Sequence, residues 1–178
     1  DETIESYYQM INGLRIAPTD ERLHIVYSPL NGTGNVPVRE MLKRMGNIDV
    51  DVVAEQEMPD GHFPTCPYPN PEIREAMKLA IEKTIATGAD MCVATDPDCD
   101  RIGAGVRQGD TVTLISGNDM GVLLLDYVCS HRKAQKGELP PVAGRLPKVP
   151  RVINTAALGG KPGVQGGSVR VLIGGQRD

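Results

Sequence analysis

The sequence has no basic run, no long apolar run and no paired cysteine motif. Its net charge at pH 7 is -4 and its pI is about 5.4, so the positive patch typical of nucleic-acid-binding proteins is missing and we expect no nucleic-acid partner. The best apolar run, VLLLDYV, is interrupted by Asp126 and is far too short to span a bilayer. We therefore expect no membrane partner either.

The four cysteines show neither CxxC spacing nor the Cys/His spacing of a zinc site: Cys66, Cys92, Cys99 and Cys129. A chain of this length builds a core without disulfides, so we expect reduced thiols and a cytoplasmic protein. The first ten residues, DETIESYYQM, are polar and lack the apolar segment of a secretory signal. Because the chain also lacks an initiating Met, we expect it to begin within a longer protein.

Short apolar stretches alternate with helical patterns over most of the chain. Strands are expected at residues 23–28, 50–55 and 91–95, helices at 36–45, 70–88 and 119–134, and a hairpin at 102–115. This alternation predicts an α/β fold: a layered, mixed, mostly parallel sheet flanked by helices, with the hairpin at one edge.

Local signals give several boundaries. Pro37 suits a first helical turn, and Gly46 suits the position after a helix end. The five prolines in residues 56–71 exclude a helix or a central strand there, so that segment is expected to be a loop. Asn70 is then expected to cap the next helix, whose predicted apolar face consists of Ile73, Ala76, Met77, Ala80, Ile81 and Ile85.

The chain is expected to divide into three parts. Residues 1–20 are a helical lead-in from a preceding domain, and residues 21–117 are an α/β domain. Residues 118–178 form the third part, in which Gly and Pro recur every few positions after residue 135, so that no independent core is visible there. In that last part only residues 151–154 and 169–173 have the composition of strands.

The segment ATDPDCDRIGAGV, residues 94–106, carries the strongest functional signal. Asp96, Asp98 and Asp100 directly follow a predicted buried strand, and Arg101 comes next. Alternate side chains of an extended segment point the same way, and three convergent carboxylates repel one another unless a cation lies between them. Oxygen ligands favour a hard divalent ion such as Mg²⁺, which would keep open positions for a phosphate oxygen, and Arg101 could hold that phosphate.

Three alternatives to a magnesium site differ in strength. A solvated surface turn remains open, but ligands of α/β folds gather where parallel strands end, which favours a site. A calcium EF-hand is excluded, since Arg101 stands where the loop needs Gly and Arg107 where it needs Glu. A phosphatase with an Asp-x-Asp nucleophile remains an alternative.

Three further features carry weaker signals. His24 lies inside a predicted strand and is expected to be structural. His62, in the proline-rich segment, is a candidate for a role near substrate, although a lone His is a weak signal. The segment NGTGN, residues 31–35, is expected to be a turn, because it lacks both the Walker lysine and the dinucleotide-binding glycine pattern.

The loop TDPDCDR resembles the metal-binding loop of the α-D-phosphohexomutases, the phosphoglucomutase and phosphomannomutase enzymes, whose usual form is Asp-x-Asp-Gly-Asp-Arg. Cys99 here replaces the usual Gly. The stretches PLNGTGNVPVREMLKRMG, EQEMPDGHFPTCPYPNPE and LISGNDMGVLLLDY also resemble that family's second domain and the start of its third. The resemblance covers roughly residues 1–140, and it implies that residues 118–178 are a partial third domain with segments missing.

The resemblance implies a four-domain enzyme that moves phosphate between the 1- and 6-hydroxyls of a hexose through a phosphoserine. It implies that Asp96, Asp98 and Asp100 bind Mg²⁺ and that Arg101 is a catalytic and substrate-binding residue. Hexose phosphate and the other domains of the parent chain would be the partners. The phosphoserine loop is not in this sequence, so the chain alone is expected to be inactive. A phosphatase-like hydrolase, or a non-catalytic module that binds divalent ions or phosphate, is the alternative.

Overall fold

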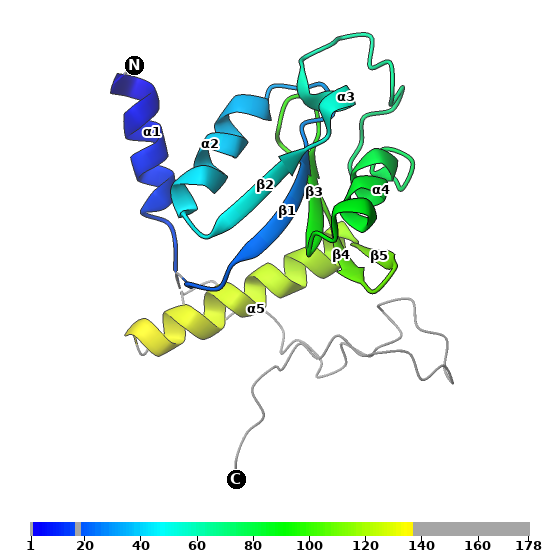
Figure 1. Ribbon diagram of the computed structural model, residues 1–178. Helices are drawn as coiled ribbons and strands as arrows, with labels where there is room; N and C mark the ends of the chain where they lie inside the picture. Colours follow the sequence, from blue (N-terminus) through cyan, green and yellow to red (C-terminus); the bar gives the residue numbers. More distant parts are fainter. Residues whose placement is uncertain (1, 17–18, 137–178) are drawn as a thin grey trace, which may run out of the picture. The chain divides into compact units, whose positions relative to one another are not determined.

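The computed structural model describes residues 2–16 and 19–136, which lie within one unit spanning residues 1–138. Figure 1 shows the elements of these residues along the chain. They are α1 (Glu2–Asn12), β1 (Leu23–Ser28), α2 (Asn35–Met45), β2 (Ile48–Val52), α3 (Ala54–Glu57), α4 (Lys78–Thr87), β3 (Met91–Thr95), β4 (Ile102–Gln108), β5 (Thr111–Ile115) and α5 (Gly117–Lys136).

The five strands form one mixed sheet in the order β2-β1-β3-β4-β5. β1 pairs in parallel with both β2 and β3, while β3–β4 and β4–β5 are antiparallel. The first parallel crossover runs from β1 through α2 to β2, and the second runs from β2 through α4 past β1 to β3. The two crossovers step in opposite directions along the sheet, so right-handed connections place α2 and α4 on opposite faces. The predicted α/β class with an edge hairpin is confirmed.

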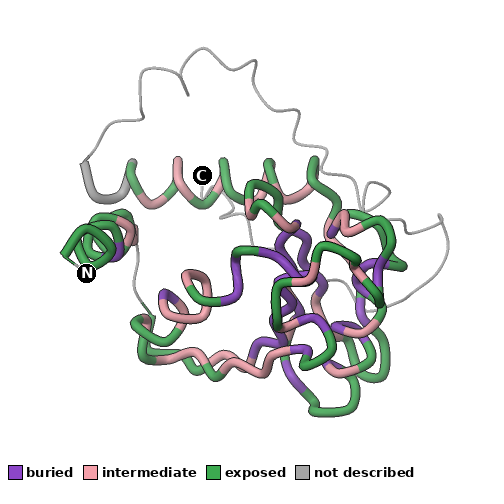
Figure 2. The backbone as a smooth tube through the Cα atoms, turned by 90° about the horizontal axis from the view of Figure 1, so that it is seen from above, coloured by how far each residue is buried: buried purple, intermediate pink, exposed green. Residues whose placement is uncertain are grey.

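The main apolar core lies between the sheet and α4. Val26 of β1 pairs with Cys92 of β3, and both are fully buried. α4 presents Ala80 and Ile81 to this face. Figure 2 shows the buried backbone concentrated in the strands and the segments that pack on them, while α1 is mostly exposed. The core thus holds β1 and β3 side by side, and their carboxyl ends meet at one edge.

Two predicted helix boundaries agree with the structure. Pro37 lies in the first turn of α2, and Gly46 ends that helix with φ of 79°, a left-handed conformation that glycine adopts at little cost. α5 begins at Gly117, two residues before the start that the sequence predicted at residue 119. The Ser116 hydroxyl accepts from the Asp119 N–H and donates to the Asp119 carboxylate, which caps the helix start.

The helix predicted at residues 70–88 begins later than expected, because residues 71–77 form successive turns and α4 begins only at Lys78. Asn70 does cap these turns, since its Oδ1 accepts from the Glu72 N–H at 3.0 Å. Pro71 is buried against Gly103 of β4, where even a Cβ atom would collide with the Pro71 backbone. Ile73 and Ile85 are 38% and 40% exposed, so their assignment to a buried apolar face was wrong.

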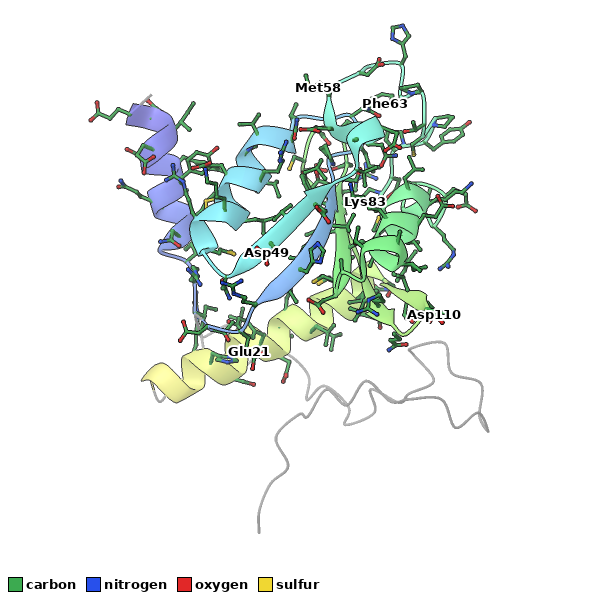
Figure 3. The ribbon with its side chains drawn as sticks, viewed as in Figure 1. Glu21, Asp49, Met58, Phe63, Lys83 and Asp110 are labelled. Carbon is green, nitrogen blue, oxygen red and sulfur yellow. The ribbon has the colours of Figure 1, made fainter. Side chains whose placement is uncertain are left out.

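The strand predicted at residues 50–55 lies earlier, at Ile48–Val52, and residues 54–57 form α3 instead. Gln56 explains the change. Its buried side chain accepts from the Ser28 hydroxyl at 2.7 Å and donates to the Thr65 hydroxyl at 3.1 Å, which draws the chain away from the sheet. Lys83 of α4 donates to the Val52 carbonyl at 2.8 Å, at the end of β2 (Figure 3).

No helix within residues 2–16 and 19–136 is long and apolar enough to cross a membrane. The strands expected at residues 151–154 and 169–173 lie outside the described residues. The division of the chain at residues 20 and 117 stays a prediction.

Candidate functional site

The acidic loop, residues 96–101, follows β3 at the carboxyl end of the parallel strands. One carboxylate oxygen from each of Asp96, Asp98 and Asp100 lies within 4.8 Å of the others. Asp96 is 3% exposed, whereas Asp98 and Asp100 are open to solvent. The sequence-predicted triplet is therefore brought together, with one anchored member and two accessible ones.

The backbone of the loop folds around Asp96. Its Oδ1 accepts from the N–H groups of Asp100, at 3.0 Å, and Arg101, at 2.8 Å. Burial is the largest single effect and favours the neutral form, but the hydrogen bonds from the Arg101 backbone and from the Asp98 and Asp100 side chains, together with the charge of the Arg101 guanidinium, outweigh it, so the pKa of Asp96 is lowered. Asp96 is accordingly ionised and serves as the fixed centre of the loop.

Asp100 shows the cost of crowding like charges. The charge of Asp98, and then that of Asp96, raises the pKa of the Asp100 carboxyl above its ordinary value. A hard cation between the carboxylates would relieve this repulsion, and three carboxylate oxygens are a donor set that Mg²⁺ accepts. The residues present therefore fit a divalent ion.

Arg101 partly balances these charges. Its Nε lies 3.3 Å from Asp96 Oδ2 and 3.8 Å from Asp100 Oδ1, and its side chain is 59% exposed. Among the described residues, its two terminal nitrogens make no hydrogen bond. The guanidinium can therefore hold the carboxylates through one nitrogen and offer the other two to an anion.

A second loop supports the acidic loop from the end of β1. Thr33 donates both its N–H, at 2.8 Å, and its hydroxyl, at 3.0 Å, to the Pro97 carbonyl. Gly32 lies so close that a Cβ atom there would collide with the Pro97 backbone. Sequence reasoning treated residues 31–35 only as a turn and missed this role. The signal was available, because parallel neighbours end at the same edge of a sheet.

Cys99 occupies an unusual backbone position for a residue with a side chain, with φ of 65°. Its thiol lies against Gly34, where a Cβ atom would be 3.0 Å from the sulfur, 2.5 Å from the Tyr27 hydroxyl and 2.6 Å from the Thr95 hydroxyl. The Tyr27 and Thr95 hydroxyls hydrogen-bond to each other at 2.8 Å. Gly34 therefore leaves room for the base of the acidic loop.

A pocket of about 470 Å³ opens beside the acidic loop. Its lining comes from two segments of the chain: Asp96, Pro97, Asp98 and Arg101 from the acidic loop, and Tyr68, Pro69, Asn70 and Ile73 from an earlier segment. The second set comes from the proline-rich segment, which leaves the carboxyl end of the parallel strands past Met58 and Phe63 (Figure 3). The carboxylates and the guanidinium thus border a cavity of the size that small ligands occupy.

Comparisons with known proteins identify the family. A family model described as "Phosphoglucomutase/phosphomannomutase, alpha/beta/alpha domain II" matches residues 5–109, which is more than half of the chain. The chain belongs to the phosphoglucomutase/phosphomannomutase family. The resemblance to this family predicted from the acidic loop is confirmed, and the match is to its second domain.

Relatives in the family share about a third of their aligned residues with the chain. A phosphomannomutase of Mycoplasmoides pirum is 38% identical over 112 residues, 63% of this chain and 21% of the relative. A probable phosphomannomutase of Haemophilus influenzae is 33% identical over 141 residues, 78% of this chain and 29% of the relative. A phosphoglucomutase of Staphylococcus aureus is 36% identical over 106 residues, 59% of this chain and 19% of the relative.

A solved structure supports the same assignment. A phosphoglucomutase/phosphomannomutase family protein from Burkholderia thailandensis superposes with a TM-score of 0.62 at 26% identity, over 72% of this chain and 26% of that protein. The chain spans less than a third of the length of the curated relatives named above.

His24 and His62 do not line the pocket beside the acidic loop. His62 is on an exposed part of the proline-rich loop, where its Nδ1 lies 3.1 Å from Asp60 Oδ1. It does not line the pocket. His24 pairs through Nε2 with Asp51 on the neighbouring strand at 2.9 Å, which agrees with a structural role.

Proposed function

We propose that the chain carries the magnesium-binding loop of a phosphohexomutase, an intramolecular phosphotransferase that interconverts hexose 1-phosphate and hexose 6-phosphate. The observation that carries the proposal is the convergence of Asp96, Asp98 and Asp100 beside Arg101 in a chain of this family. The names of the relatives, phosphomannomutase and phosphoglucomutase, support a reaction on phosphorylated mannose or glucose.

Each residue has a separate task in this proposal. Asp96 gives an ionised oxygen whose position the backbone N–H groups fix, while Asp98 and Asp100 supply accessible oxygens. Bound Mg²⁺ would neutralise charge on the phosphoryl group during transfer. Arg101 orients a phosphate by donating from its terminal nitrogens, while its Nε stays near Asp96.

The reaction also needs groups from elsewhere. A phosphoserine and further sugar contacts would come from other domains of a longer cytoplasmic parent protein, so the 178-residue chain alone is expected to be inactive. The acidic loop is then the part of the site that holds the cation. Asp96 is poorly placed as a phosphatase nucleophile, because it is buried and its Oδ1 accepts two backbone N–H groups.

The test is an assay of the full-length parent protein with hexose 1-phosphate. We expect interconversion that requires Mg²⁺ and falls by roughly a hundredfold or more in Asp98→Ala, whereas Asp110→Ala, in the exposed hairpin turn, keeps full activity. Interconversion that is unaffected by chelation or by Asp98→Ala would refute the proposal. Release of inorganic phosphate without isomerisation would instead support a hydrolase.

A further inference from the structure

The proline-rich wall of the pocket contains residues that the proposed mechanism does not use. Tyr68 is 80% exposed, yet its backbone is held. Its carbonyl accepts from the Asn70 N–H at 2.7 Å and from the thiol of buried Cys66 at 3.2 Å. A rigid backbone thus presents an aromatic ring to solvent at the mouth of the pocket, where packing does not require one.

The two polar atoms of the Asn70 side chain differ in their contacts. Its Oδ1 is engaged with the Glu72 N–H, which fixes the side chain in the turn. Its Nδ2 donates to no group among the described residues, although Asn70 lines the same pocket as Asp98 and Arg101. An amide donor held by its other end is pre-organised to meet a ligand acceptor.

The net charge of the acidic loop determines which ligand can bind beside it and whether a cation must bind first. Three carboxylates and one guanidinium leave the loop with a charge of -2, which repels an anion. A divalent cation brings this total to zero. Arg101 and Asn70, which come from two different segments, then offer N–H donors to an anion in a pocket of about 470 Å³. The occupant that matches is a phosphate monoester, whose oxygens accept several hydrogen bonds while the attached group lies against Tyr68 and Pro69.

We propose that Asn70 and Tyr68 form the second wall of a binding site for a phosphate monoester, which enters once the acidic loop holds its divalent ion. Asn70 Nδ2 donates to a phosphate oxygen, and the Tyr68 ring covers the carbon skeleton next to it. This inference rests on the proposed function and deepens it. Two sources share the chemistry: a sugar phosphate, or a phosphoserine side chain from another part of the parent protein.

The test uses the ¹⁵N-labelled 178-residue chain in saturating Mg²⁺, titrated by NMR with glucose 6-phosphate and, separately, with O-phosphoserine. Asn70→Asp keeps the oxygen that caps Glu72 and replaces only the donor. Asn12→Asp, at the exposed end of α1, makes the same charge change away from the pocket. Tyr68→Phe removes only an exposed hydroxyl and Tyr68→Ala the ring, with Tyr7→Ala on α1 as the control.

We expect Asn70→Asp to raise the Kd of the phosphate ligand by roughly tenfold or more, with Mg²⁺ affinity unchanged, while Asn12→Asp changes it less than about twofold. Tyr68→Ala should weaken binding and Tyr68→Phe should weaken it less. Tighter binding of glucose 6-phosphate than of O-phosphoserine identifies the sugar phosphate as the occupant, and the reverse order identifies the phosphoserine. Either order supports the pocket.

Equal Kd values for Asn70→Asp and Asn12→Asp would overturn the inference and leave the proposed function intact. So would a Mg²⁺-loaded chain that binds neither phosphate at millimolar concentration. A chain that does not bind Mg²⁺ at the acidic loop would count against the proposed function itself, so the two failures are distinguishable.

Discussion

The three aspartates of the acidic loop have the same chemistry but different environments. Asp96 is buried, its Oδ1 accepts two backbone N–H groups, and its pKa is lowered. Asp100 is exposed, and the charges of Asp98 and Asp96 raise its pKa. This combination suits the proposed cation site, because the anchored ligand would define the position and the accessible ligands could close around the ion.

Gly32 tests the support of this loop. Gly32→Ala would place a Cβ against the Pro97 backbone, which cannot rotate away, so we expect a loss of about 1–3 kcal/mol in unfolding free energy and weaker Mg²⁺ binding. Urea unfolding and calorimetric titration measure the two effects. Gly61→Ala is the control, because nothing lies within 4 Å of its Cβ position. Equal stability of the two variants would show that the loops do not press together.

Tyr27 gives a pH-dependent signal beneath the loop. Burial, partly offset by the hydrogen bond with Thr95, raises the pKa of Tyr27 to about 12. The folded pKa lies above the unfolded one, so this stabilisation is complete below pH 10 and is lost as the pH rises towards 12. Absorbance at 295 nm should show a component near pH 12 that is absent from Tyr27→Phe. A titration identical in both proteins would contradict the assignment.

At the scale of elements, the site depends on β1 and β3 being parallel neighbours. Val26 pairs with Cys92, and Ser28 with Ala94, so the loops that follow these strands meet. Thr33 then reaches Pro97 through two hydrogen bonds. The acidic loop is local in sequence, but its support is not.

This difference explains how far the sequence alone could predict the molecule. The apolar strands, the hairpin and the end of α2 at Gly46 follow local rules, and so does the triplet that follows β3. The late start of α4 could not be predicted, because it depends on the burial of Pro71 against Gly103. Two other features likewise depend on tertiary contacts: the hydrogen bonds between Thr33 and the acidic loop, and the pocket that this loop shares with Asn70.

The corrected face of α4 gives a prediction of its own. Met77 is fully buried and Ile85 is 40% exposed, although the sequence placed both on one apolar face. Met77→Ala should lower the unfolding free energy by about 2–5 kcal/mol, and Ile85→Ala by less than about 1 kcal/mol. Urea denaturation of both variants measures the difference. Similar losses of stability in the two variants would contradict the different burial of Met77 and Ile85.

At the scale of the whole described unit, side-chain contacts join α1 to α2. The Arg44 guanidinium donates to both carboxylate oxygens of Glu5 at 2.8 Å and lies 4.5 Å from the centre of the Tyr8 ring. These contacts are exposed, so their effect on global stability is small, but they hold α1 in position.

Arg44→Ala should therefore free α1 without unfolding the sheet. We expect amide exchange in residues 2–12 to accelerate by roughly tenfold, while exchange in β1 and β3 is unchanged. Hydrogen exchange read by mass spectrometry measures this, with Arg74→Ala as a control that removes the same charge from an exposed position. Exchange in α1 that is equal in both variants would mean that other contacts hold the helix.

A Mg²⁺ titration of the ¹⁵N-labelled chain tests most directly whether the acidic loop binds a divalent ion. We expect saturable chemical-shift changes centred on residues 95–101. The Mg²⁺ affinity should fall by roughly tenfold or more in Asp98→Asn and stay unchanged in Asp110→Asn, which removes an equal charge at the hairpin turn (Figure 3). Shifts that are absent at about 20 mM Mg²⁺, or that are equal in the two variants, would contradict binding at the acidic loop.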